Sequence, residues 1–131
     1  MELKTHLEIN PRLSGKVAEL NEGYAKVVLE TSEVMRADPQ GLVHGGFAFG
    51  AADYAAMSAV NDPNVVLSKS ESKFVAPIRV GERVVFEANI IKRNEAKQTV
   101  EVIGMIRDKQ VFAGTFYTVV LEQHVLEGQR R

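Results

Sequence analysis

The alternation of apolar and polar residues along the chain predicts that most of it forms β-strands. Residues 16–31 contain two short runs on either side of the turn Asn21-Glu22-Gly23, where glycine readily adopts a positive φ. Four longer runs rich in β-branched and aromatic residues follow, at 65–76, 82–92, 98–107 and 111–121. The connections between consecutive runs are short, which predicts antiparallel hairpins.

One segment breaks this pattern and predicts a single long helix. Residues 44–60 contain six alanines and no β-branched residue before Val60, so their helix propensity is high. The sequence Asn61-Asp62-Pro63-Asn64 then ends the helix. Before it, we expect a short helix or an arm over 1–13 and a loop over 32–43. Because one apolar helix has to bury itself against a sheet, we predict an α+β fold in which a curved antiparallel sheet of about five to six strands wraps the helix.

The length of 131 residues is typical of one domain, which we expect to span 1–131 with a disordered tail over about 126–131. An open sheet leaves edge strands, and proteins commonly cover or pair such edges. We therefore expect a homodimer or a dimer of dimers.

Composition excludes several classes of function. With 16 Lys and Arg against 17 Asp and Glu, the net charge is -1, which argues against nucleic acid or an anionic membrane as the partner. The absence of cysteine excludes disulfides, thiolate metal sites and a cysteine nucleophile. The His, Asp and Glu residues lack metal-ligand spacing, so we expect neither a metal nor a cofactor. The N-terminus lacks a signal-peptide core and no apolar run approaches ~20 residues, so a cytoplasmic location is expected.

The start of the predicted helix is the first candidate site. Gly45 and Gly46 carry no side chain, so a ligand can reach two N–H groups that have no partner inside the helix and lie at the positive end of its dipole. Such a position stabilises a carbonyl oxygen that gains negative charge, as in an oxyanion hole. The alternative is that the glycines only permit tight packing against a strand.

Asp53 is the second candidate, because a carboxylate on so apolar a helix needs a partner or a role. It lies seven residues beyond Gly46, close to two full turns, so both share a face but are about 10 Å apart along the axis. Asp53 therefore cannot act on a carbonyl bound at its own helix start, although it can act on one bound by an antiparallel partner helix. The alternative is a solvated or hydrogen-bonded structural carboxylate.

Two further residues precede the helix. Asp38 stands in the sequence Asp-Pro-Gln-Gly, which is an ordinary turn signal and explains the aspartate without any chemistry. His44 immediately precedes the double glycine, where it is expected either to cap the helix, to orient a substrate or to serve a structural role.

These residues together resemble a known family. The run Leu42-Val43-His44-Gly45-Gly46, followed by Ala52-Asp53, resembles the hotdog-fold acyl-CoA thioesterases of the phenylacetate-pathway type. In that group an HGG motif opens the central helix, and the catalytic carboxylate stands nine positions after the histidine, as Asp53 does here. Phe74-Val75-Ala76-Pro77 and then Gly81-Glu82 resemble the passage that follows the helix in this superfamily.

The resemblance implies a mechanism for thioester hydrolysis. The thioester carbonyl would bind the Gly45 N–H, and Asp53 of the other subunit would act as general base on water or as nucleophile. Asp38 stands where the phenylacetate type often has asparagine, and its loop resembles that of bacterial 4-hydroxybenzoyl-CoA thioesterases, in which the loop aspartate is catalytic. If Asp53 and Asp38 converge on one site, the repulsion between their negative charges would raise the pKa of one of the two carboxyl groups. We rank Asp53 first and Asp38 second.

The resemblance also implies a coenzyme A thioester as the ligand, lying along the subunit interface. Candidates for contact with the acyl group are Phe47, Phe49, Tyr54 and Met57, although apolar residues on a buried helix are more often plain core. Phe74 is a further candidate for contact with the substrate. Candidates for contact with the phosphates are Lys69, Lys73, Arg79 and Arg83.

Two alternatives to hydrolysis stay open. Residues 65–120 resemble the effector-binding hotdog domain of the fatty-acid and phospholipid synthesis repressors, which binds malonyl-CoA without hydrolysing it. The segment before the first strand is too short for the DNA-binding domain of those repressors, so a binding-only acyl-CoA sensor is the second hypothesis. A hydratase or dehydratase that uses His44 with an aspartate is the third.

Overall fold

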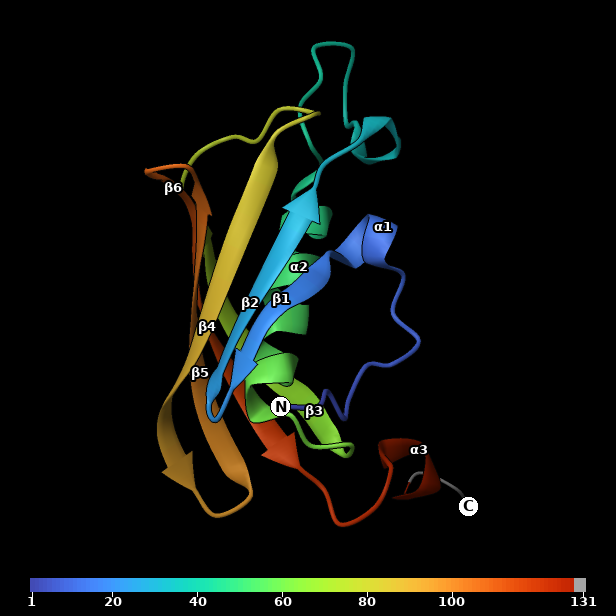
Figure 1. Ribbon diagram of the computed structural model, residues 1–131, viewed down its shortest axis with the longest axis vertical. Coiled ribbons are helices and arrows are strands. Elements are labelled where there is room, and N and C mark those ends of the chain that lie inside the picture. The colour runs from blue at the N-terminus through green and yellow to red at the C-terminus, as the bar shows by residue number, and fades with distance from the viewer. Residues whose placement is uncertain (129–131) are drawn as a thin grey trace.

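The structure is a computed structural model that describes residues 1–128 (Figure 1). It contains six strands and one long helix. The strands are β1 (Lys16–Asn21), β2 (Tyr24–Glu30), β3 (Val65–Phe74), β4 (Arg83–Asn94), β5 (Lys97–Ile106) and β6 (Lys109–Val120). The helices are the long α2 (Gly45–Val60) and the short α1 (Pro11–Ser14), α3 (Val125–Gly128) and 3-10 turn η1 (Glu33–Met35).

All six strands form one antiparallel sheet in the order β1-β2-β4-β5-β6-β3. The expected hairpins form at β1–β2, β4–β5 and β5–β6. The expectation is wrong for β3 and β4, because β3 pairs with β6 and β4 pairs with β2. The connection between them, residues 75–82, instead crosses from one side of the sheet to the other, and β3 becomes an edge strand. The predicted α+β architecture with five to six strands is confirmed.

The predicted central helix is confirmed, with its first residue at Gly45. It packs against the sheet through small residues, since Ala48, Ala51, Ala52, Ala55 and Ala56 are all buried. The large side chains of the core come from the sheet, which contributes the fully buried rings of Phe86, Phe112 and Phe116. Asn61 ends the helix in the left-handed conformation, with φ 54°, which asparagine tolerates better than most residues.

The N-terminal segment forms an arm over 1–10 that leads into α1 and lies on the side of α2 away from β5 and β6 (Figure 1). Asn61 fixes this arm to the end of α2, because its Oδ1 accepts the Lys4 N–H at 2.7 Å and its Nδ2 donates to the Glu2 carbonyl at 2.9 Å. The prediction of a short helix or an arm holds for both of its parts.

The C-terminal tail is more ordered than expected over part of its length. Residues 126–128 belong to α3 because His124 caps them: its Nδ1 accepts the Leu126 N–H at 3.0 Å and its carbonyl accepts the Glu127 N–H at 2.9 Å. The remainder of the expected disordered tail, 129–131, lies outside the described residues.

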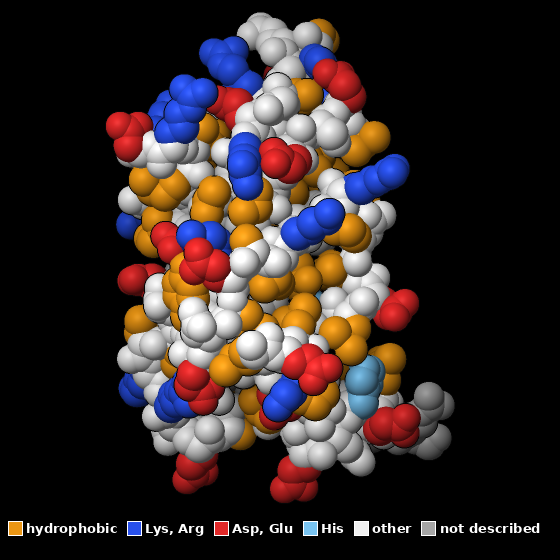
Figure 2. Space-filling view, viewed as in Figure 1, with side chains coloured by type: hydrophobic (Ala, Val, Ile, Leu, Met, Phe, Trp, Pro, Cys, Tyr) orange, Lys and Arg blue, Asp and Glu red, His pale blue; other side chains and the backbone are white. Residues whose placement is uncertain are grey.

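Basic and acidic side chains are interspersed over the face seen in Figure 2, with apolar side chains between them. Within residues 1–128, none of the helices has the length and apolar character needed to cross a membrane. In the same range, His, Asp and Glu side chains nowhere gather in threes as a metal ion would require.

Candidate functional site

Two loop contacts hold the start of α2 in place. The His44 N–H donates to the Met35 carbonyl at 2.9 Å, and the Val43 N–H donates to the Ile78 carbonyl at 2.8 Å. Across residues 1–128, neither Gly45 nor Gly46 donates its N–H to another group. The first turn of α2 therefore offers two free donors at the positive end of the helix dipole.

An aromatic side chain forms a wall beside these donors. A Cβ added to Gly45 would lie 3.4 Å from Cε1 of Phe74, so the ring is in van der Waals contact with the helix start. Phe74 in turn packs edge-on against Phe112, with 5.5 Å between ring centroids. Phe74 is nevertheless 56% exposed, which leaves one side of its ring available to a ligand or a partner chain.

Asp53 has the environment of a reactive carboxylate. Its Oδ1 is buried and accepts no hydrogen bond from the described part of the chain. Burial raises the pKa of Asp53 to about 6, because desolvation disfavours the charged form. A carboxylate with a pKa near the working pH is suited to general-base catalysis.

The two halves of this candidate site lie on one face of α2 but do not meet within one chain. Gly46, Gly50 and Asp53 follow one another at i, i+4 and i+7, which places them on one side of the helix. Seven residues at 1.5 Å each separate the free N–H groups from the carboxylate by about 10 Å. A reaction that uses both groups at once needs a second copy of the chain.

Asp38 has a structural use in the loop before the helix. Its Oδ1 accepts the N–H of Gln40 at 3.0 Å and the N–H of Leu42 at 3.1 Å. Arg36 supports the same loop by donating to the carbonyls of Asp38 and Pro39, each at 3.2 Å. These bonds explain Asp38 without a catalytic role and favour the ranking of Asp53 above it.

His44 does not cap the helix with its side chain. Its exposed ring instead lies over Gly46, where an added Cβ would come within 3.3 Å of Nε2. Phe47 packs edge-on against the same ring at 6.2 Å. The structure therefore brings His44, Phe47 and Phe74 to the helix start with the two glycines.

Phe49 and Lys73, two of the predicted contact residues, point away from the helix start. Phe49 leans onto the core ring of Phe116, with centroids 5.6 Å apart. Lys73 points to the outer face of the sheet, where it lines a depression with Glu101 and Ile103, because successive strand residues point to opposite faces and Phe74 points inward.

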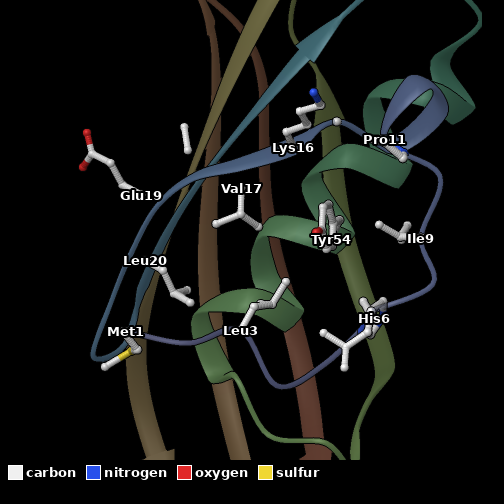
Figure 3. Close-up of a pocket in the computed structure, with 13 residues that line it drawn as sticks. Met1, Leu3, His6, Ile9, Pro11, Lys16, Val17, Glu19, Leu20 and Tyr54 are labelled. Carbon is white, nitrogen blue, oxygen red and sulfur yellow. The ribbon is translucent and has the colours of Figure 1, made fainter.

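Tyr54 points into a separate pocket of about 660 Å³ between the N-terminal arm and β1 (Figure 3). His6 lies beside it, with ring centroids 6.2 Å apart, and burial lowers the pKa of His6. Neither Asp53 nor the double glycine lines this pocket. The pocket is large, but it lacks the groups that the proposed chemistry needs, so we do not assign it as the reaction site. The chemistry of the helix start is the better guide to function.

One residue of the shared helix face was not singled out from the sequence. Among residues 1–128, a Cβ added to Gly50 would meet nothing within 4 Å, so the backbone of α2 is bare at this position, between Gly46 and Asp53. A glycine inside an alanine-rich helix lowers the stability of the helix relative to alanine. Its presence at position 50 was therefore a signal in the sequence that this position needs to lack a side chain.

The comparison with protein families decides the classification. Residues 40–113, more than half of the chain, match the model described as "Thioesterase superfamily". The chain belongs to the thioesterase superfamily. The match includes the loop of Asp38 from Gln40 onward, the whole of α2 and most of the sheet.

Solved structures place this thioesterase-superfamily chain in the hotdog fold. Protein PH1136 from Pyrococcus horikoshii is 49% identical and superposes with a TM-score of 0.95, covering 96% of this chain and 97% of that one. A point mutant of the phenylacetic acid degradation protein PaaI from Thermus thermophilus is 28% identical, with a TM-score of 0.76 over 83% and 95% of the two chains.

Curated relatives are longer proteins. A methylthioribose-1-phosphate isomerase from Aquifex aeolicus is 46% identical over 99% of this chain, but the match spans 28% of that protein. Transcription factor FapR from Caldanaerobacter subterraneus is 28% identical over 86% of this chain and 57% of its own length. The chain thus corresponds to less than two thirds of either relative.

Proposed function

We propose that this protein hydrolyses an acyl thioester, of coenzyme A or of an acyl carrier, to a free acid and a thiol. One observation carries the proposal: within residues 1–128, α2 presents two free N–H groups at its start and, two turns later, the carboxylate of Asp53, whose buried Oδ1 has no partner. Membership of the thioesterase superfamily and the likeness to PaaI support this reaction class.

The active unit we propose is a homodimer, alone or within a dimer of dimers. Strand β3 is an edge of the sheet and ends at Phe74, which contacts Gly45. A second copy that pairs with this edge would therefore lie beside the helix start. The second copy would supply an Asp53 carboxylate to this helix start, because the chain's own Asp53 lies ~10 Å away along the helix axis.

In the proposed reaction, the thioester carbonyl accepts hydrogen bonds from the N–H groups of Gly45 and Gly46. Asp53 of the partner subunit removes a proton from water as the water oxygen bonds to the carbonyl carbon. The oxyanion that forms is stabilised by the helix start. The C–S bond then breaks, and the thiolate takes up the proton that Asp53 accepted.

The test is thiol release from short, medium, long and aromatic acyl-CoAs by the wild type, Asp53→Asn and Asp38→Asn. We expect Asp53→Asn to lower kcat at least 100-fold, as for loss of a general base. Asp38→Asn should lower it less than tenfold, because the amide oxygen can still accept the two loop N–H groups. The reverse order would assign catalysis to Asp38.

A binding-only acyl-CoA sensor is the second candidate, and the likeness to transcription factor FapR favours it. Under this alternative, acyl-CoA binds saturably but is not hydrolysed, and Asp53→Asn leaves its affinity unchanged. Isothermal titration calorimetry with a non-hydrolysable thioether analogue of the acyl-CoA measures binding alone. Together with the hydrolysis assay, it distinguishes a sensor from a hydrolase. Hydration of a crotonyl-type thioester in the same panel would instead indicate a hydratase.

A further inference from the structure

The bare stretch of α2 at Gly50 is the feature that the proposed reaction has not used. The alanines of α2 pack against the sheet, and Gly46, Gly50 and Asp53 share the opposite side of the helix. The end of this side is covered, because Met57 is 1% exposed. At Gly50 this side presents backbone rather than a side chain, because a Cβ added there would meet nothing within 4 Å among the described residues, whereas the His44 ring lies over Gly46.

The chain places complementary groups at the two ends of this bare stretch. The N–H groups of Gly45 and Gly46 lack acceptors within residues 1–128, and the Asp53 carboxylate lacks a donor there. Two antiparallel copies of the helix bring the two kinds of group together, because each carboxylate then faces the other copy's donors across the space that the thioester carbonyl and the water would occupy. This reciprocity identifies a second copy of the chain as the occupant of the bare stretch.

Two-fold symmetry fixes where such helices cross. In an antiparallel pair related by a two-fold axis, the axis passes midway between any residue and the residue that it faces. If Asp53 faces the helix start of its partner, the midpoint with Gly45 is residue 49, and the midpoint with Gly46 falls between 49 and 50. The Phe49 ring is turned toward Phe116, 5.6 Å away. Gly50 is then the residue left at the axis.

We infer that Gly50 is a positioning residue at which the two α2 helices of a dimer cross backbone to backbone. Glycine at a crossing allows helices to approach more closely than the 8–10 Å usual for helices with side chains at the contact. The spacing at this point sets the distance from Asp53 of one subunit to the donors of the other. This inference rests on the cross-subunit arrangement of the proposed function. It adds the residue that sets the distance between the two halves of the site.

A cysteine crosslink tests the crossing without any assay of activity. The chain has no cysteine, so Gly50→Cys carries a single thiol in an otherwise unchanged chain of 131 residues. Two residues at the crossing have Cα atoms within the 4.4–6.8 Å that a disulfide requires. We expect mild oxidation to convert most of the Gly50→Cys chain to a covalent dimer on a non-reducing gel. Glu22→Cys, exposed in the β1–β2 turn, is the matched control and should stay monomeric on the same gel.

A second variant pair covers the case in which a side chain at position 50 prevents folding. A chain with Gly46→Cys is refolded together with a tagged chain carrying Asp53→Cys. The crossing predicts a mixed disulfide between the two, in excess of either homodimer. Gly50→Ser, followed by circular dichroism, reports whether a small side chain at position 50 disturbs the fold.

The activity arm uses Gly50→Leu, whose side chain would push the helices apart. Misplacement of a reacting group by about 1 Å can cost 100-fold in rate, so we expect kcat to fall at least 100-fold while the far-ultraviolet circular dichroism is retained. Absence of both crosslinks from a hydrolytically active dimer would overturn the crossing and leave the hydrolase assignment intact. Crosslinks in a protein without hydrolysis would support the crossing and overturn the assignment. A Gly50→Leu enzyme that keeps its rate and shifts its acyl-length preference would place the acyl chain, rather than the partner helix, at Gly50.

Discussion

Oδ1 of Asp53 is buried and accepts no hydrogen bond from residues 1–128, and this burial affects how the carboxylate titrates. Burial raises its pKa to about 6, so the carboxylate becomes a usable base only above that pH. We expect kcat/KM to fall tenfold per pH unit below about pH 6, since only the ionised form accepts the proton. A pH profile of kcat/KM from pH 4 to 9, with a substrate that does not titrate there, is the measurement. A profile that stays flat down to pH 4 would exclude Asp53 as the base.

The same burial predicts that Asp53 lowers the stability of the protein at neutral pH. Its pKa in the folded chain is raised from 3.8 to about 6, so the folded state binds the proton more tightly than the unfolded state does. The contribution to stability is present below about pH 4 and is lost as the pH rises through about 6. We therefore expect Asp53→Asn to raise the free energy of unfolding at pH 7.5 by on the order of 2 kcal/mol, and to leave it unchanged at pH 4. Urea unfolding at both pH values is the measurement.

Asp38 provides the control for that experiment. Its Oδ1 accepts two backbone N–H groups, so Asp38→Ala should lower the free energy of unfolding by roughly 1–3 kcal/mol. If Asp53→Asn is no more stable than the wild type at pH 7.5, the buried carboxylate has a donor in solution, and the partner's helix start is the first place to look for it.

The two aspartates also mark the limit of what the sequence alone can decide. Spacing on the helix was enough to predict that Asp53 and Gly46 share a face and lie apart along the axis. It left the turn role and the catalytic role of Asp38 both open, because a turn aspartate and a catalytic one have the same local pattern. The difference lies in which N–H groups its carboxylate meets, and these depend on the whole path of the loop.

At the scale of the elements, local periodicity predicted the helix and all six strands, but not where β3 lies in the sheet. Hairpin logic assumes that consecutive strands are neighbours. Here β2 and β4 pair over the helix, with register from Tyr24–Asn89 to Glu30–Arg83, and this leaves β3 to pair with β6. That choice depends on non-local burial of α2, which no short window of sequence contains.

Close aromatic packing between strands gives a prediction at this scale. A Cβ at Gly104 of β5 would lie 2.8 Å from Cε1 of Phe86 and 3.0 Å from Cβ of Phe112. Both rings are fully buried and cannot move away without disturbing the core. We expect Gly104→Ala to lower the free energy of unfolding by about 1–3 kcal/mol, measured by urea unfolding. Gln110→Ala, exposed on the neighbouring strand, should change it by less than about 0.5 kcal/mol, and an equal effect of the two would refute the packing argument.

At the scale of the whole molecule, the sheet has two unlike edges. The N-terminal arm and α1 lie beside the β1 edge, and Asn61 ties this arm to the end of α2. The β3 edge runs for ten residues to Phe74 at the helix start. Thr5, His6, His124 and Val125 line a pocket with the first three residues of β3, whereas residues 68–74 are mostly exposed. An exposed edge of this kind favours pairing with another chain. The edge beside the candidate site is thus the one at which we place the second subunit.

A site shared between subunits makes a prediction that a site within one subunit does not. Asp53→Asn keeps the donors of Gly45, whereas Gly45→Val keeps Asp53 but covers the donors with a branched side chain. Each homodimer is expected to be inactive. In a heterodimer, the intact Asp53 of one chain faces the intact Gly45 of the other, so one of its two sites is complete.

Equal amounts of the two variants, unfolded in urea and refolded together, should therefore recover about a quarter of the wild-type activity, because half of the dimers are mixed and each has one complete site. The measurement is thiol release from the best acyl-CoA of the panel, with each variant refolded alone as the control. Circular dichroism of Gly45→Val establishes that it folds. If the site lies within one subunit, every chain in the mixture carries a defect and no activity returns. Recovery near a quarter would instead require that each catalytic unit draws its donors and its carboxylate from different chains.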